Sequence, residues 1–302
     1  PDGKQASTGA LMQAGGSDGE PTVAALLKSS EAQLKDSSRS ARLDAEVLLA
    51  HALGWQRARL YGEGRERVRP EIVQRFTQLI EERQTGRPIA QLVGTREFWS
   101  LELTVTPDTL VPRAETEMLV ELALNRIPPD TAARVLDLGT GTGAVALALA
   151  RERPRLQIIA TDLSEEALKV ARYNAGALKI DNVEFRFGDW YKPAAGEQFD
   201  AVFSNPPYVT DQEWMLNHFE LCHEPAMALR AGRDGLLALE NVVEGAPAHL
   251  VPGGWLLVEH GFRQGPAAMR LFQETGFTAL STYRDLPGRP RVTEGQWPSD
   301  DD

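Results

Sequence analysis

Hydrophobic positions recur with different spacings along the chain, and the changes in spacing divide it into parts. Between residues 21 and 86 apolar residues return every three or four positions, which is the spacing of helices that bury one face. In "SARLDAEVLLAHALG", for example, Leu43, Val47 and Leu48 would lie on one stripe. We therefore predict a small helical domain over 21–86.

The pattern changes at residue 87. The stretch "PIAQLVGTREFWSLELTVTPDTLVP" is rich in β-branched and aromatic residues, with turn formers at Gly94 and Pro107, so we predict a β-hairpin linker over 87–112. Over 113–295 short buried runs such as "ARVLDLG" and "FDAVFSN" alternate with helical segments such as "EEALKVARYNAGAL". This alternation predicts an α/β fold, a Rossmann-like and mostly parallel sheet with helices on both faces.

The two ends of the chain show no periodicity. Residues 1–20 are rich in glycine and serine, and "PSDDD" at 298–302 is polar, so we predict a disordered tail at 1–20 and an unstructured end. No apolar run approaches the roughly 18 residues of a membrane helix, and no signal-peptide pattern opens the chain. We expect a cytoplasmic protein without membrane contact.

Charge and cysteine content exclude several classes of function. The formal net charge is −11, which argues against stable nucleic-acid binding because that depends on Lys and Arg contacts to phosphates. Cys222 is the single cysteine and the five histidines show no ligand spacing, so we expect neither a disulfide nor a metal site. We expect a monomer. The arginines between Arg57 and Arg69 fit a solvated surface, with a docking patch as the alternative.

A glycine loop follows one of the predicted strands. In "VLDLGTGTGAVALALA", Gly139, Gly141 and Gly143 allow a sharp turn and let a ligand approach backbone N–H groups without a Cβ in the way. A tight structural turn would have the same sequence. The next strand, however, ends in Asp162, 19 residues past Gly143, where a carboxylate can accept bonds from both ribose hydroxyls.

Polar residues at neighbouring strand ends narrow the choice of ligand. Asp189 and Trp190, in "GDW", could bind and cover an adenine ring. No phosphate-binding lysine follows the loop, and Asp137 just before it would repel a pyrophosphate but could accept bonds from a cationic amino-acid group. Ribose, adenine and a charged amino acid without phosphate describe S-adenosylmethionine. The predicted cofactor residues are Asp137, Leu138, Gly139, Thr140, Gly141, Gly143, Asp162, Asp189, Trp190 and Asn205.

The stretch "FSNPPYV" places two prolines directly after a buried strand. Pro206 and Pro207 cannot continue a strand ladder, because proline lacks the N–H and fixes φ. Asn205 and Tyr208 are therefore held in a stiff loop at the strand end. A rigid turn without a ligand is the alternative, and the preceding glycine loop and acidic strand end count against it.

Taken together, "DLGTGTG", "GDW" and "NPPY" resemble the motifs of class I S-adenosylmethionine-dependent methyltransferases that act on planar nitrogens. With "REFWSLELTVTPDTLVPRAETE", "EPAMALRAGRDGL", "VEHGFRQG" and "RDLPGRPRV", the chain resembles the HemK/PrmC family of release factor glutamine N5-methyltransferases over about residues 21–292. Ala114 departs from the proline that the family more often has after "PR", which we expect to affect loop stiffness only. The resemblance implies methylation of the glutamine in the Gly-Gly-Gln motif of class-1 peptide chain release factors, leaving S-adenosylhomocysteine. It also implies that the helical domain over 21–86 docks the folded factor.

The resemblance also implies roles for individual residues. The Asn205 side-chain oxygen and the Pro206 carbonyl would accept both N–H bonds of the substrate amide, and these bonds strengthen as positive charge develops on nitrogen. Tyr208 would lie against the flat amide, and water would take the proton. Asn205, Pro206 and Tyr208 are thus the predicted catalytic residues. The predicted substrate-binding residues are Asn205, Pro206, Pro207, Tyr208, Phe98 and Arg113, with core packing as the alternative for Phe98.

Other functions stay open at this point. Glutamine methylation of a ribosomal protein uses the same chemistry. An adenine-N6 DNA methyltransferase presents a flipped base to the same motif, but the net charge and the absence of an insert after "NPPY" count against it. A catalytically silent binding module is disfavoured by the intact Asn205 and glycine loop. The role of Glu224 and the preferred release factor are left undecided.

Overall fold

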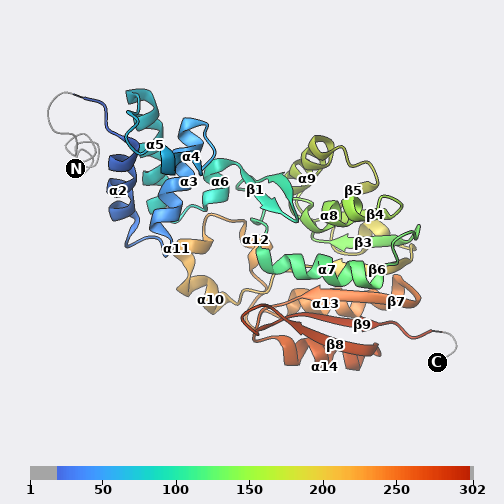
Figure 1. Cartoon of the computed structure of the whole chain (residues 1–302). Helices are drawn as coiled ribbons and strands as arrows, with labels where there is room; N and C mark the ends of the chain where they lie inside the picture. The colour runs from blue at the N-terminus through green and yellow to red at the C-terminus, as the bar shows by residue number, and fades with distance from the viewer. Residues whose placement is uncertain (1–18, 300–302) are drawn as a thin grey trace. The chain divides into compact units, whose positions relative to one another are not determined.

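The computed structural model of the chain describes residues 19–299 (Figure 1). Most of the tail predicted over 1–20 and the last three residues of the predicted unstructured end therefore lie outside the described residues. The described chain divides into two compact units between Gly94 and Thr95. Within residues 19–299 no helix has both the length and the apolar composition that crossing a membrane requires.

The first unit is helical, as predicted. Its helices are α2 (Val23–Leu34), α3 (Ala41–Leu53), α4 (Arg59–Gly62), α5 (Pro70–Gln84) and α6 (Ile89–Val93). Leu26, Leu48 and Phe76 belong to its fully buried apolar core. The predicted stripe on α3 is partly wrong, because Leu43 is 43% exposed while Leu48 is buried.

The β-hairpin is shorter than the predicted 87–112. Ile89–Val93 forms helix α6 instead of a strand, and the hairpin consists of β1 (Thr95–Phe98) and β2 (Leu101–Thr104) in antiparallel pairing. The reason is the spacing of Ile89, Leu92 and Val93, which puts all three against the helical core of the first unit. Gly94, at φ +86°, then ends the helix.

Within the described residues the second unit is built on a seven-stranded sheet in the order β5-β4-β3-β6-β7-β9-β8. The strands are β3 (Arg134–Leu138), β4 (Gln157–Asp162), β5 (Val183–Phe187), β6 (Phe199–Ser204), β7 (Leu250–Glu259), β8 (Thr278–Arg284) and β9 (Pro290–Gln296). β3 to β7 pair in parallel, and β9 pairs antiparallel with both β7 and β8. The strand order reverses between β3 and β6, and ligands of open α/β sheets bind beside such a reversal, outside the carboxyl ends of the strands.

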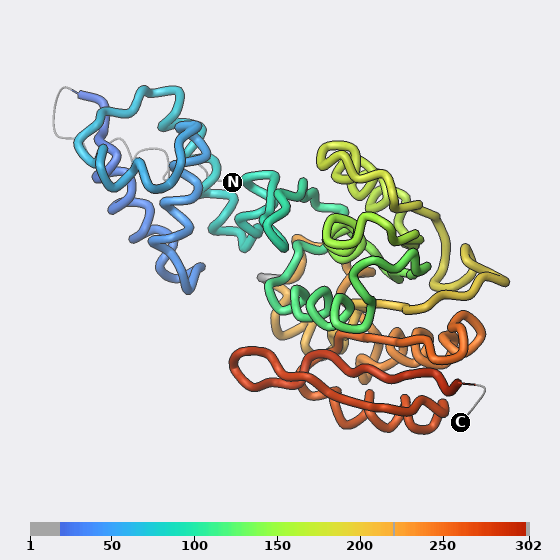
Figure 2. The backbone as a smooth tube through the Cα atoms, turned by 45° about the vertical axis from the view of Figure 1, so that its right-hand side comes forward, coloured from blue at the N-terminus to red at the C-terminus, as the bar shows by residue number. Residues whose placement is uncertain are grey.

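Helices cover both faces of this sheet, which confirms the predicted α/β fold (Figures 1 and 2). One apolar cluster joins α7 (Glu117–Arg126), α8 (Ala144–Glu152) and α9 (Glu165–Leu178) to the sheet, and the other joins α13 (Leu237–Gly245) and α14 (Gly265–Thr275). Successive side chains of β3 point to opposite faces of the sheet, so Val135 belongs to the first cluster and Leu136 to the second. The short helical segments are η1 (Ala114–Thr116), η2 (Lys192–Ala194), α10 (Asp211–Leu216), α11 (His218–Leu221), α12 (Ala226–Leu229) and η3 (Ala246–Ala248).

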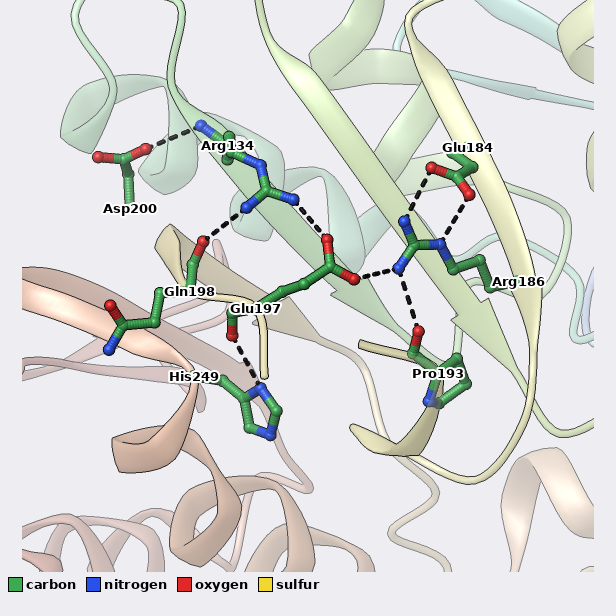
Figure 3. A network of polar contacts seen from close by, with 8 residues as sticks. All are labelled: Arg134, Glu184, Arg186, Pro193, Glu197, Gln198, Asp200 and His249. Atoms are coloured by element: carbon green, nitrogen blue, oxygen red, sulfur yellow. Dashed lines mark hydrogen bonds and ion pairs between the residues drawn. The ribbon is translucent and has the colours of Figure 1, made fainter. Parts of the chain in front are cut away.

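A polar network links β3 to β5 through residues just before β6 (Figure 3). Glu197 forms ion pairs with both Arg134 of β3 and Arg186 of β5. The Arg134 backbone N–H donates to Asp200 Oδ2 at 2.8 Å, and Arg186 donates two bonds to Glu184 at 2.8 and 2.9 Å. These contacts connect β3 and β5, which are separated in the sheet by β4.

Candidate active site

The glycine loop and the Asn-Pro-Pro-Tyr loop leave the sheet from neighbouring strands. β3 and β6 pair in register, with Leu138 opposite Ser204. The Ser204 hydroxyl donates to the Leu138 carbonyl at 2.9 Å, just before both chains turn out of the sheet. Gly139 and Asn205 therefore follow adjacent strand ends, at the reversal of strand order.

The glycine loop has the conformation that its sequence predicts. Gly139 and Gly141 lie at φ +73° and +56°, and a Cβ at either position would meet no atom within 4 Å. The loop is held from behind, because the N–H groups of Gly139 and Thr140 donate to the Thr161 carbonyl at 2.9 and 3.0 Å. The loop thus leaves open space along its outer side for a ligand.

Two carboxylates support this loop. Asp137 is buried and accepts a bond from the Thr140 hydroxyl at 2.6 Å. Burial raises the pKa of Asp137 to about 6, with the Thr140 bond acting in the opposite direction. Asp162 accepts bonds from the N–H groups of Gly141 at 2.8 Å and Ser164 at 2.9 Å, and burial raises its pKa too. The two Asp162 oxygens each accept one of these bonds, and a carboxylate has about four acceptor positions in all.

Two cavities adjoin at the carboxyl edge of the sheet. The first cavity includes these predicted residues in its lining: Gly139, Gly141, Asp162, Asp189, Trp190, Asn205 and Pro207. The second cavity includes Arg113, Thr116, Asp137, Gly139, Thr140, Gly141 and Asn205. Leu138 and Gly143 line neither cavity. Leu138 is buried in the sheet, and Gly143 packs against the Leu147 side chain, which a Cβ on Gly143 would approach to 3.0 Å. The structure therefore brings most of the predicted cofactor residues together.

Asn205 lies where the first and second cavities share lining residues. Its Nδ2 donates to the Thr116 hydroxyl at 3.1 Å, which turns the side-chain oxygen away from Thr116. Pro207 lines the first cavity. Pro206 is buried and lines neither cavity. Tyr208 lines a third cavity, together with Arg291, and burial raises its pKa to about 12.

The two substrate residues predicted outside the Asn-Pro-Pro-Tyr loop differ in placement. Phe98 is 1% exposed and packs in an apolar cluster with Leu101 and Leu103, so its position favours core packing over the substrate contact that we expected. Arg113 lines the second cavity and forms an ion pair with Glu224.

Three further side chains are buried at this edge of the sheet. The sequence leaves the role of Glu224 undecided, and neither Thr116 nor Glu259 is among the residues predicted from it. Glu224 accepts a bond from the Val111 N–H at 2.8 Å as well as pairing with Arg113, so it anchors the segment before η1. Thr116 contacts Asn205, which is 89 residues away along the chain. Glu259 ends β7 and is buried. An acidic residue closing the apolar run "WLLVE" was a signal for Glu259, whereas no local pattern marks Thr116.

Comparison with known proteins gives matches over both units. The family "PrmC N-terminal domain" matches residues 25–94, and the family "Methyltransferase small domain" matches residues 114–279. A release factor glutamine methyltransferase of Xylella fastidiosa (strain Temecula1) is 46% identical over 262 residues, covering 87% of this chain and 95% of the relative.

A second relative and a solved structure carry the same description. The Pseudomonas aeruginosa PAO1 relative, also named release factor glutamine methyltransferase, is 46% identical over 276 residues, covering 91% of this chain and 99% of its own. A solved structure of a release factor-specific protein-(glutamine-N5) methyltransferase from Alicyclobacillus acidocaldarius is 27% identical, with a TM-score of 0.41, covering 65% of this chain and 99% of that one. On the identity and coverage of the two relatives, this chain belongs to the release factor glutamine methyltransferase family.

Proposed function

We propose that the first and second cavities hold S-adenosylmethionine, and that the chain methylates N5 of the glutamine in the Gly-Gly-Gln motif of a class-1 release factor. The observation that carries this proposal is the placement of Asn205. Its amide lies beside the glycine loop and is held from behind by Thr116, so its carbonyl end is available to a substrate.

The residues at the carboxyl edge fit the cofactor. Gly139 and Gly141 have open space where a Cβ would stand, which suits the close approach of a ligand to the loop. Asp162 would accept bonds from the ribose hydroxyls, and Asp189 with Trp190 would hold the adenine. The buried Asp137 would favour the cationic amino-acid end, directly or through water.

The reaction needs an amide nitrogen aimed at a methyl carbon. When bound, the cofactor supplies an electrophilic methyl group on a sulfonium sulfur, and the glutamine nitrogen gains that methyl and gives up one proton. We assign the Asn205 side-chain oxygen as one acceptor of the amide N–H groups. The second is the Pro206 carbonyl, the peptide oxygen between the buried Pro206 ring and Pro207, which lines the first cavity. Because Pro206 and Pro207 hold these acceptors in advance, little reorganisation is needed as positive charge develops on nitrogen. Water takes the proton after transfer.

The family assignment does not favour the alternative substrates. The relatives named above are described as acting on release factors, not on a ribosomal protein or on DNA adenine. We propose that the helical first unit supplies remote binding energy for the folded factor, which raises the effective concentration of its glutamine at Asn205.

A methylation assay with labelled cofactor tests this function. A release factor, its Gln→Ala variant in the Gly-Gly-Gln motif, a ribosomal protein and duplex DNA are offered side by side. We expect label on the unaltered release factor alone. Label on DNA, or equal label on the Gln→Ala variant, would contradict the proposal.

Asn205→Ala tests the assigned role within the same assay. We expect kcat to fall roughly 100-fold or more, as for loss of a preorganised polar contact to a transition state, while cofactor affinity stays measurable. Asn241→Ala, at an exposed position of α13, is the matched control and should leave kcat unchanged. A loss of cofactor affinity as large as the loss of kcat would show that Asn205 acts in cofactor binding instead.

A further inference from the structure

Thr116 connects Asn205 to a buried carboxylate on the next strand. β6 and β7 pair in register with Ser204 opposite Val258, so the residues that follow, Asn205 and Glu259, lie side by side at the sheet edge. Thr116 of η1 is also buried there. It accepts a bond from Asn205 Nδ2 at 3.1 Å, and its side chain is near enough to the Glu259 carboxylate to lower the pKa of that group, in the direction that a hydrogen bond from the Thr116 hydroxyl gives.

The direction of these two hydrogen bonds follows from the charge on Glu259. An ionised carboxylate only accepts, so the single hydroxyl proton of Thr116 must point at Glu259. The Thr116 oxygen can then only accept from Asn205, and the amide must present its NH₂ end. The carbonyl end of Asn205 is left for the cavity. A protonated Glu259 could instead donate to Thr116, which would free the hydroxyl proton to bond the Asn205 oxygen and reverse the amide.

We propose that Glu259 is a positioning residue whose negative charge, acting through the Thr116 hydroxyl, keeps the Asn205 oxygen facing the substrate amide. The proposal rests on the function assigned above for its consequence in catalysis. The arrangement of Asn205, Thr116 and Glu259 on which it depends does not involve the substrate.

The burial of Glu259 has no evident structural benefit. The side chain is 1% exposed, and its Oε2 has no hydrogen-bond partner among the described residues. The nearby cation Arg291 is already engaged by Asp285 at 3.0 Å. A buried carboxylate that is only partly satisfied destabilises the folded chain, and such groups are retained mostly at functional sites.

Several charged groups face Glu259 from the surrounding elements. Burial raises its pKa to about 7, while the Thr116 bond and the charges of Arg291 on β9 and Arg113 before η1 act in the opposite direction, and Glu115 on η1 adds to the rise. The Tyr208 hydroxyl is also within its electrostatic influence, and His260 follows it in the chain, with a pKa that burial lowers. Above pH about 7 the carboxylate is charged and Asn205 is held in the productive orientation. As the pH falls through this value the orientation is released, so activity should decline on the acid side.

The test compares pH profiles of kcat for the full chain and three variants with a release factor as substrate. We expect the unaltered enzyme to show an acid limb near pH 7. Thr116→Ser keeps the hydroxyl and should keep both the limb and most of the activity. Glu259→Gln and Thr116→Val should each lower kcat roughly 10-fold or more and flatten the limb, with cofactor affinity unchanged.

A second readout does not need turnover. The side-chain amide resonance of Asn205 in ¹⁵N-asparagine-labelled protein, assigned by its loss in Asn205→Ala, should shift with a midpoint near pH 7 in the unaltered chain and in Thr116→Ser. It should not shift in Glu259→Gln or Thr116→Val. A titrating resonance in an enzyme that does not methylate release factors would support the positioning role and refute the proposed function. An Asn205 resonance that ignores pH, or an acid limb that persists in Glu259→Gln, would overturn the positioning role.

Discussion

At the scale of single residues, the site depends on carboxylates that burial makes harder to ionise. Asp137, Asp162 and Glu259 lie at the same edge of the sheet, and burial raises the pKa of each. Each also has a hydroxyl or N–H donor that stabilises its charge. The donors differ, because Asp162 is held by the backbone of the loops that it orders, whereas Glu259 is held by one side chain. We therefore expect Asp162 to act in binding and Glu259 in orientation.

Replacement of Asp162 by alanine tests its assignment to the cofactor. The variant loses the bonds from Gly141 and Ser164, and it removes the carboxylate that we propose as the acceptor for two ribose hydroxyls. Because hydrogen bonds to a charged group are worth about 1.5–3 kcal/mol, we expect the calorimetric Kd for cofactor to rise roughly 10- to 100-fold. Asp181→Ala, at an exposed aspartate near the start of β5, is the control. An unchanged Kd would remove Asp162 from the cofactor site.

The residues whose placement at the carboxyl edge the sequence predicted are those that stand at their own strand end. Asp162 and Asn205 could be assigned because each follows an apolar run, and all parallel strands end at one edge. Thr116 could not, because its contact with Asn205 depends on how η1 folds back over the sheet. Phe98 was assigned to substrate by resemblance, and only the packing of the hairpin shows that it is enclosed.

At the scale of elements, the sequence predicted types more reliably than boundaries. Residues 89–93 have β-branched composition but helical spacing, and burial against the first unit favours the helix. Leu43 fits a helical stripe on paper, yet the buried face of α3 is centred on Ala45, Leu48 and Leu49. In both segments the structure depends on the surface against which the segment packs. The sequence of the segment alone does not identify that surface.

The hairpin and the glycine loop are joined to α9 by one side chain. Asn174 donates to the carbonyls of Thr104 at 3.1 Å and Thr142 at 3.0 Å, and accepts from the Thr104 N–H at 2.8 Å. Asn174→Ala would leave these backbone groups unpaired in a buried place. We expect the free energy of unfolding to fall by about 3 kcal/mol and the cofactor Kd to rise as the loop loosens.

Chemical denaturation and calorimetry measure both effects of Asn174→Ala. Asn241→Ala serves again as control, since its side chain makes one exposed bond to the Leu237 carbonyl at 2.9 Å. A variant with lowered stability but unchanged Kd would show that Asn174 ties the hairpin to α9 without ordering the loop.

At the scale of the whole molecule, each unit has an apolar core of its own. Leu48 belongs to the core of the first unit, and Phe203 to the cluster between the sheet and α7, α8 and α9. Because hydrophobic stabilisation is proportional to the apolar area buried within each core, the two cores should resist opening independently.

Leu48→Ala and Phe203→Leu separate these contributions. Both side chains are fully buried, so Leu48→Ala should destabilise the first unit by about 3 kcal/mol and Phe203→Leu should destabilise the second. Hydrogen exchange read by mass spectrometry reports each segment: Leu48→Ala should speed exchange in peptides from α2 to α5 and leave β3 and β6 unchanged, and Phe203→Leu should do the reverse. Leu286→Ala, at a fully exposed leucine, should alter neither. If either core variant sped exchange equally in both units, the two units would open as one cooperative body. A substitution in the helical unit that changed the proposed docking of the release factor would then also change the stability of the sheet.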